Sequence, residues 1–245
     1  MPANSLRTLM MICGVVVPLL IWTMPGHTAA EDFEPPTLGP SRWRVFDFET
    51  QHMAVRPDRI PDRVPGGLAF DFFAMPDTVL FGTRHPSLRG TVLGDLTGQT
   101  VTATVGVTVT SGQPQFTYFG APDVCDRAPN VRLYFRTNPW GTPQEETDHW
   151  WSNPTAVALE ALQEGHDHTL TASLADPSQW SDGNGHFASD PVYTAAFFKA
   201  VQEVRFIGVS FGGGCFFANG VGTVPGTGRV FFRLMEFTVT PAPRE

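Results

Sequence analysis

The run from Thr100 to Thr110 constrains the fold more than any other part of the chain, because it alternates apolar and hydroxyl side chains. Valine stands at positions 101, 105, 107 and 109, with threonine between most of these positions. Successive side chains of a strand point to opposite faces, so this period of two places valine on one face and hydroxyl groups on the other. The run therefore predicts a long β-strand with a single buried face.

Shorter patterns of the same kind predict strands along most of the remaining chain. They fall at residues 44–49, 68–73, 79–82, 91–94, 115–119, 130–137, 156–159, 168–174, 203–210 and 229–240. The composition of residues 156–163 also allows a helix there. The cluster of Pro57, Pro61 and Pro65 predicts a loop that takes no part in a sheet.

One segment has the period of a helix instead. Ser189, Asp190 and Pro191 form a helix start signal, and apolar residues at 192, 196, 197, 200 and 201 follow at helical spacing. We expect a helix of about three turns here, packed across an end or a face of the sheets.

These elements predict an all-β fold, a single jelly-roll β-sandwich with one short helix. The sandwich domain covers residues 42–241, after an extended lead-in at 31–41 and before a tail at 242–245. With 245 residues, of which 42% are hydrophobic, the chain can bury a sizeable core. Strands do not alternate with helices, which disfavours a parallel α/β architecture.

The first thirty residues are typical of an export signal. Arg7 precedes an apolar run from Leu9 to Trp22, and small residues lead to a predicted cleavage after Ala30. The run is shorter than the roughly 20 residues that span a bilayer, and no later stretch is long or apolar enough to do so. We therefore expect a secreted protein without a transmembrane segment in the mature chain.

Charge excludes one class of partner, and the cysteines predict a crosslink. The net charge of −8 has the wrong sign for binding a phosphate backbone, so we expect no nucleic acid. Cys13 would leave with the leader, and the remaining pair, Cys125 and Cys215, favours a disulfide in an oxidising compartment. A thiolate metal site is the alternative, but neither cysteine has a second one nearby in the sequence.

Two motifs resemble catalytic or metal sites in part. Residues 208–212 fit the pattern G-x-S-x-G around Ser210, but no helix start follows, and no histidine lies further along the chain. A turn between strands, with glycines that let the backbone approach a neighbour, is the favoured interpretation. His166 and His168 would lie on one face of an extended segment, yet a third metal ligand is missing from the motif.

The loop from Asp182 to His186 offers oxygen atoms at alternate positions. Asp182 and Asn184 are candidate ligands of a structural calcium ion, although the pattern is not that of an EF-hand. A glycine-rich loop ahead of the helix is the alternative. No other cofactor is expected.

Tryptophans gather in the middle of the chain, at positions 140, 150, 151 and 180. If Trp150 and Trp151 lie in a strand, they point to opposite faces, so at most one belongs to the core. An exposed indole can stack on the apolar face of a sugar, and burial of both at the rim is the alternative. For glycoside hydrolysis, Asp47, Glu49, Glu145 and Glu146 are the candidate carboxylates.

Several segments resemble secreted bacterial jelly-roll proteins similar to galactose-binding-like carbohydrate-binding modules. The resemblance rests on residues 45–49, the turn 94–100, residues 150–154, residues 207–213 and the closing strand 231–240. It implies a non-catalytic role in binding an extracellular glycan or an envelope component. The candidate ligand-contacting residues are Trp140, Asp148, His149, Trp150, Trp151 and Asn153. The alternatives are a hydrolase acting on polysaccharide and a structural interaction protein without a glycan ligand.

Overall fold

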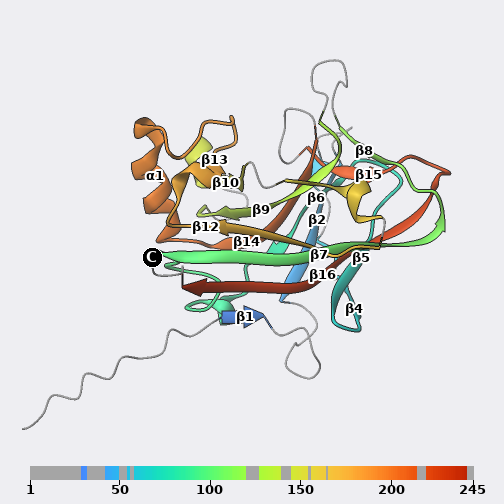
Figure 1. The fold of residues 1–245 in the computed structure, drawn as a ribbon, viewed down its shortest axis with the longest axis horizontal. Coiled ribbons are helices and arrows are strands. Elements are labelled where there is room, and N and C mark those ends of the chain that lie inside the picture. Colours follow the sequence, from blue (N-terminus) through green and yellow to red (C-terminus); the bar gives the residue numbers. More distant parts are fainter. Residues whose placement is uncertain are drawn as a thin grey trace, which may run out of the picture.

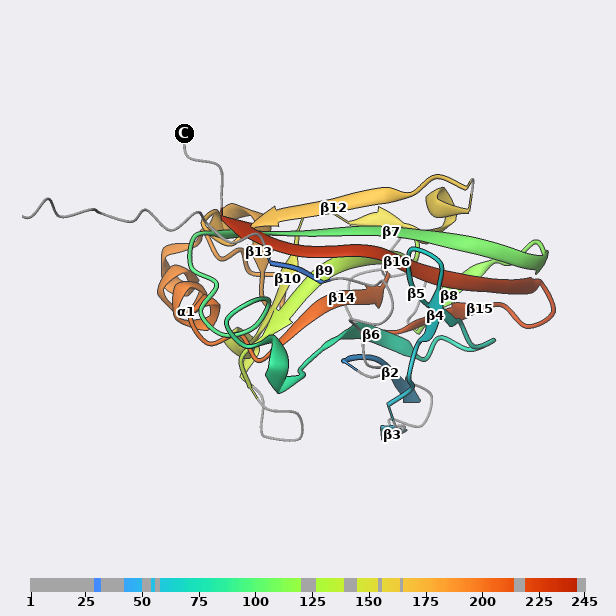
Figure 2. The same cartoon turned by 90° about the horizontal axis from the view of Figure 1, so that it is seen from below.

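The computed structural model describes residues 29–31, 42–49, 54–55, 58–119, 127–138, 145–153, 156–163, 165–213 and 219–241. These residues form two antiparallel sheets that lie one over the other, with a helix at one end (Figures 1 and 2). The predicted fold class, an all-β sandwich with one short helix, is confirmed.

The first layer is a six-stranded sheet. Its strands are, in spatial order, β12 (His168–Ser173), β7 (Gln99–Gly112), β16 (Gly228–Pro241), β5 (Gly67–Asp71) and β4 (Asp62–Val64), and β1 (Ala29–Glu31) pairs with β16 beside this path. The predicted valine–threonine strand is the central β7, which pairs with β16 along almost its whole length.

The second layer is a ten-stranded sheet. Its main path runs β13 (Trp180–Ser181), β10 (His149–Ser152), β9 (Asn130–Arg136), β14 (Phe206–Gly212), β6 (Thr78–Thr83), β15 (Val221–Thr223) and β8 (Phe116–Tyr118). β11 (Val157–Ala158) pairs with β9, β2 (Trp43–Glu49) pairs with β6, and β3 (Ala54–Val55) pairs with β2.

Among the described residues, four short 3-10 helices connect these strands, and one α-helix closes an end of the sandwich. The 3-10 helices are η1 (Pro86–Leu88), η2 (Glu146–Asp148), η3 (Leu159–Leu162) and η4 (Pro177–Gln179). The predicted helix is α1 (Pro191–Val201), which Asp190 caps by accepting a hydrogen bond from the Val192 N–H. Among the described residues, no helix is long and apolar enough to span a membrane.

The core lies between the two sheets and continues beneath α1. Phe70 and Phe232 of the first sheet pack edge-on against Phe81 and Phe211 of the second. At the other end, Phe197 of α1 packs against the core-facing rings of the ten-stranded sheet. The helix therefore packs over the core at that end of the sandwich.

Some local predictions are wrong. Asp62–Val64 forms β4 in the predicted proline loop, because an edge strand can be flanked by Pro61 and Pro65 without losing a hydrogen bond that the sheet needs. Residues 91–94 form turns and isolated bridges, so no strand lies there.

The predicted turn around Ser210 is also wrong, because Phe206–Gly212 is one continuous strand. The expected close approach of its glycines does occur. Gly208 faces Gly82 across the strand pair, and a Cβ at Gly208 would lie 2.2 Å from the carbonyl oxygen of Phe81. The segment 156–163 combines both alternatives, a short strand followed by a 3-10 helix.

Candidate functional site

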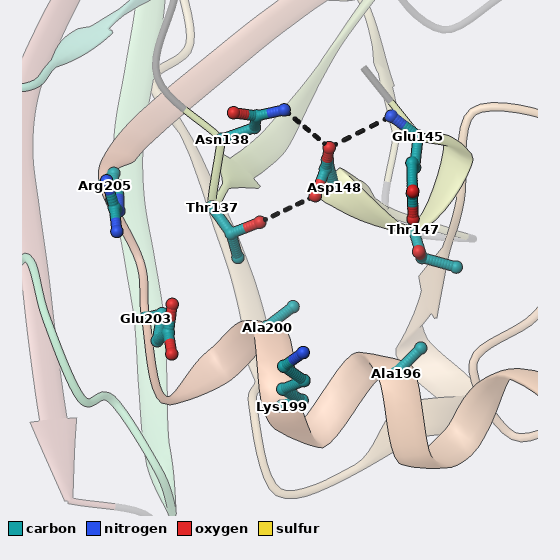
Figure 3. A pocket seen from close by; sticks show the side chains of 10 residues that line it. All are labelled: Thr137, Asn138, Glu145, Thr147, Asp148, Ala196, Lys199, Ala200, Glu203 and Arg205. Carbon is teal, nitrogen blue, oxygen red and sulfur yellow. Dashed lines mark hydrogen bonds between the residues drawn. The ribbon is translucent and has the colours of Figure 1, made fainter. Parts of the chain in front are cut away.

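A polar cavity of about 470 Å³ lies between η2, the end of β9 and the C-terminal half of α1 (Figure 3). We call it the Asp148 pocket. Its lining residues are Thr137, Asn138, Glu145, Thr147, Asp148, Ala196, Lys199, Ala200, Glu203 and Arg205. Of these ten residues, only the two alanines are apolar, so a ligand here meets hydrogen-bonding groups on most sides.

Asp148 is the most firmly held carboxylate of the pocket. It accepts hydrogen bonds from the Glu145 backbone N–H at 3.0 Å, the Asn138 amide at 2.8 Å and the Thr137 hydroxyl at 3.2 Å (Figure 3). Partial burial raises the pKa of Asp148, but these donors outweigh burial and hold the pKa below its ordinary value. Asp148 is therefore an ionised acceptor at neutral pH.

Two cationic side chains and one carboxylate line the same pocket from a different part of the chain. Lys199 lies in the last turn of α1, and Glu203 and Arg205 lie in the turn that leads from the helix to β14. All three side chains are exposed. The pocket thus presents two cations beside three carboxylates, and it opens to solvent.

His149 follows Asp148 but points into the protein. Its Nδ1 lies 2.6 Å from the Tyr134 hydroxyl, and its ring stacks at 17° on Trp151. Burial, and then the charge of Arg136, lowers the pKa of His149 to about 4, although Asp148 opposes the change. His149 is therefore neutral at physiological pH and does not line the pocket.

The expected tryptophan platform is not present at Trp150 and Trp151. The two side chains do point to opposite faces of β10, but both are buried, with exposed fractions of 0% and 7%. Trp150 packs on Phe197 in the main core, and Trp151 joins a second apolar cluster with Tyr134 and Phe206 on the outer face. The alternative, burial of both indoles, is what the structure has.

Trp150 nevertheless supports the pocket from behind. Its indole N–H donates a hydrogen bond of 2.9 Å to the carbonyl oxygen of Thr147, which lines the cavity. Asn153 lies outside the pocket. Its backbone N–H donates to the carbonyl oxygen of Gln179 in η4, and its amide nitrogen lies 3.5 Å from the hydroxyl of Ser181 in β13. Trp140 lies outside the described residues.

The remaining sequence motifs do not assemble catalytic sites among the described residues. Ser210 is fully buried and accepts the indole N–H of Trp151 at 3.0 Å, so its hydroxyl is inaccessible to a substrate. His166 and His168 are exposed and belong to no cluster of metal-ligating side chains in the described part of the chain. Cys125 and Cys215 both lie outside the described residues.

The candidate carboxylates are dispersed. Asp47 is buried and paired with the Arg59 guanidinium, while the Thr78 hydroxyl donates to it at 2.8 Å. Glu145 lines the Asp148 pocket, whereas Glu49 ends β2 and its side chain lies outside the described part of the structure. Glu146 is exposed on η2, where it approaches the loop after β13.

The predicted calcium ligands Asp182 and Asn184 lie in one turn after β13. Asp182 is fully buried, and its Oδ1 accepts hydrogen bonds of 2.9 Å from the backbone N–H groups of Asn184 and His186. Asn184 is exposed, and its backbone N–H is one of these two donors. These hydrogen bonds fit the alternative interpretation, a glycine-rich loop ahead of the helix, and calcium binding by Asp182 and Asn184 stays a prediction.

Of the six predicted ligand-contacting residues, Asp148 alone lines the pocket among those that the structure describes. Sequence analysis missed Lys199, Glu203 and Arg205. One signal was available, because Lys199 is the single lysine of the chain. The chain matches no protein-family model, no curated protein and no solved structure.

Proposed function

We propose that this chain is an exported, non-catalytic protein that binds a hydroxyl-rich extracellular glycan in the Asp148 pocket. The observation that carries the proposal is the polar lining of that cavity, which offers donors and acceptors side by side. Ligand pockets are usually lined mainly by apolar side chains, so a lining of this kind favours a ligand covered with hydroxyl groups.

The lining matches the chemistry of a sugar hydroxyl, which donates one hydrogen bond and accepts others. Asp148 and Glu203 supply acceptors, while Lys199 and Arg205 supply donors. Hydrogen bonds to charged groups contribute about 1.5–3 kcal/mol each, so a few of them are enough to hold a short glycan.

The state of Asp148 favours binding over hydrolysis. A glycosidase needs one carboxylic acid with a raised pKa that can protonate the leaving group. The pKa of Asp148 is lowered instead, and its three hydrogen bonds hold it as an acceptor. A hydrolase that uses Glu145 stays the alternative, and it would release new reducing ends from polysaccharides.

Lysine labelling tests the proposal directly, because Lys199 is the one lysine in the chain and is exposed. The full chain is acetylated in the presence of each member of a panel of soluble glycans, and the peptide that contains Lys199 is quantified by mass spectrometry. A glycan that binds in the pocket is expected to slow acetylation of Lys199 at least about tenfold at saturation, while the N-terminal amine reacts as before.

Two pairs of variants give matched controls. Glu203→Gln and Arg205→Gln are each expected to weaken binding about tenfold, the effect of losing roughly 1.4 kcal/mol. Glu236→Gln on β16 and Arg89→Gln near η1 make the same chemical changes outside the pocket and should leave affinity unchanged. The proposal fails if no glycan protects Lys199, or if pocket and control variants behave alike.

A further inference from the structure

A second group of side chains meets behind η2, on the side of the loop that follows β13. Glu146 of η2, Asp182 and His186 each offer one ligand atom, and these atoms lie within 4.8 Å of one another. We call this set the His186 group. It joins two segments of the chain, 146 and 182–186, that only the tertiary structure brings together.

The geometry between Asp182 and His186 fits two ligands of one ion. The Oδ2 atom of Asp182 lies 3.0 Å from Nδ1 of His186. Two ligands bound at about 2.1 Å to a first-row metal are about 3.0–3.4 Å apart at angles between octahedral and tetrahedral. Glu146 is exposed, so rotation of its side chain can bring a third oxygen into the same shell.

Asp182 and His186 are each held in place by contacts within the protein. The other oxygen of Asp182 accepts the two backbone N–H groups of its own loop, which leaves Oδ2 directed at His186. The His186 ring stacks on Tyr193 of α1, with 4.6 Å between centroids and 8° between planes. Such supporting contacts orient the ligands of metal sites and strengthen binding.

The charge around the group favours a cation. Within the described part of the chain, neither Glu146 nor Asp182 is paired with a lysine or arginine. The two carboxylates of the group therefore attract a cation.

We propose that Glu146, Asp182 and His186 bind one divalent first-row transition metal ion of the Zn²⁺ type, with water completing the coordination. One imidazole with two carboxylates suits Zn²⁺ and its neighbours, whereas Ca²⁺ prefers six to eight oxygen ligands. The ion would join η2 to the loop before α1. Because Glu145 and Thr147 flank Glu146 and line the Asp148 pocket, it would also hold one wall of that pocket.

Titration calorimetry of the untagged full chain with Zn²⁺ alone tests the site without any glycan. We expect one Zn²⁺ per chain, bound at least tenfold more tightly than Ca²⁺. His186→Ala should weaken Zn²⁺ binding at least about tenfold, the scale of effect that even supporting residues have at metal sites. Glu146→Gln is an exposed change that should preserve the fold and should also weaken binding, by a smaller factor.

His168→Ala is the matched control, because it removes an exposed histidine on β12 that belongs to no such group among the described residues. It should leave the affinity for Zn²⁺ unchanged. The proposal is overturned if the chain binds no Zn²⁺, if it binds Ca²⁺ more tightly, or if neither Glu146→Gln nor His186→Ala weakens binding. Glycan binding does not enter this test, so the two proposals can fail separately.

Discussion

The two sheets of the sandwich differ in how far solvent reaches their outer faces. In the six-stranded sheet, strands such as β12 alternate buried and exposed residues, and hydroxyl pairs such as Thr102–Thr171 cover the outside. In the ten-stranded sheet, β6, β9 and β14 are buried at every position. An alternating pattern therefore predicts exposure only where nothing covers the second face.

This difference explains why Trp150 and Trp151, although adjacent on a strand, are both buried. Their opposite orientation on β10 follows from strand geometry, but the outer face of this sheet holds its own apolar cluster. That cluster is mixed with polar groups, including the Tyr134–His149 pair and Ser210. The outer face of the ten-stranded sheet is thus a second, more polar core.

The largest expected effect comes from removing either indole. Trp150→Ala and Trp151→Ala should each lower the free energy of unfolding by about 3–5 kcal/mol, because each leaves a large cavity in a buried cluster. Chemical denaturation measures the change. If Trp151→Ala costs less than about 1 kcal/mol, the outer face is open and the comparison between the sheets breaks down.

The next effect is a dependence of stability on pH that comes from His149, beside Trp151 and Tyr134 on the outer face of the ten-stranded sheet. The pKa of His149 is about 4 in the folded protein and 6.5 in the unfolded chain. The unfolded state therefore binds more protons at pH values between 4 and 6.5. Stability should therefore be complete above about pH 6.5 and fall by at most about 3 kcal/mol as the pH drops to 4.

Unfolding curves of His149→Gln and the wild type at pH 7 and pH 5 measure this contribution. The variant should show a shallower loss of stability on acidification. His168→Gln on the exposed face of β12 is the control and should keep the wild-type slope. A wild-type slope in His149→Gln would show that the imidazole is not buried in its neutral form.

A smaller effect is expected where a polar group supports the outer cluster. Ser210→Ala removes the acceptor of the Trp151 indole N–H and should lower stability by about 1–2 kcal/mol. Ser111→Ala makes the same change at an exposed position of β7 and should have little effect. Equal losses in both variants would argue against a structural role for the Ser210 hydroxyl.

The smallest effect should lie on the outside of the six-stranded sheet. Thr102→Ala loses a hydroxyl pair with Thr171 at 3.3 Å on a face that solvent reaches, so the change should stay within about 0.5 kcal/mol. Thermal unfolding is sensitive enough to detect a larger loss. A cost above about 1 kcal/mol would mean that this face, too, is covered.

Local pattern was a good guide to the elements but a poor guide to the site. The strand around Thr100–Thr110 and the helix after Asp190 could be predicted because alternation and capping are local properties. Asp148 was identified for its position beside the tryptophans, yet it contributes through a network with Thr137 and Asn138. The indoles themselves are buried.

Neighbouring residues and their period are enough to predict the all-β class, the long valine–threonine strand with one exposed face, and the start of the helix. The tertiary structure alone places cover on both faces of β6, β9 and β14, because no local pattern records what lies over a strand. It also decided where α1 packs. That packing brings Lys199, Glu203 and Arg205 to Asp148, and His186 to Glu146, across distances in the chain that no spacing rule connects.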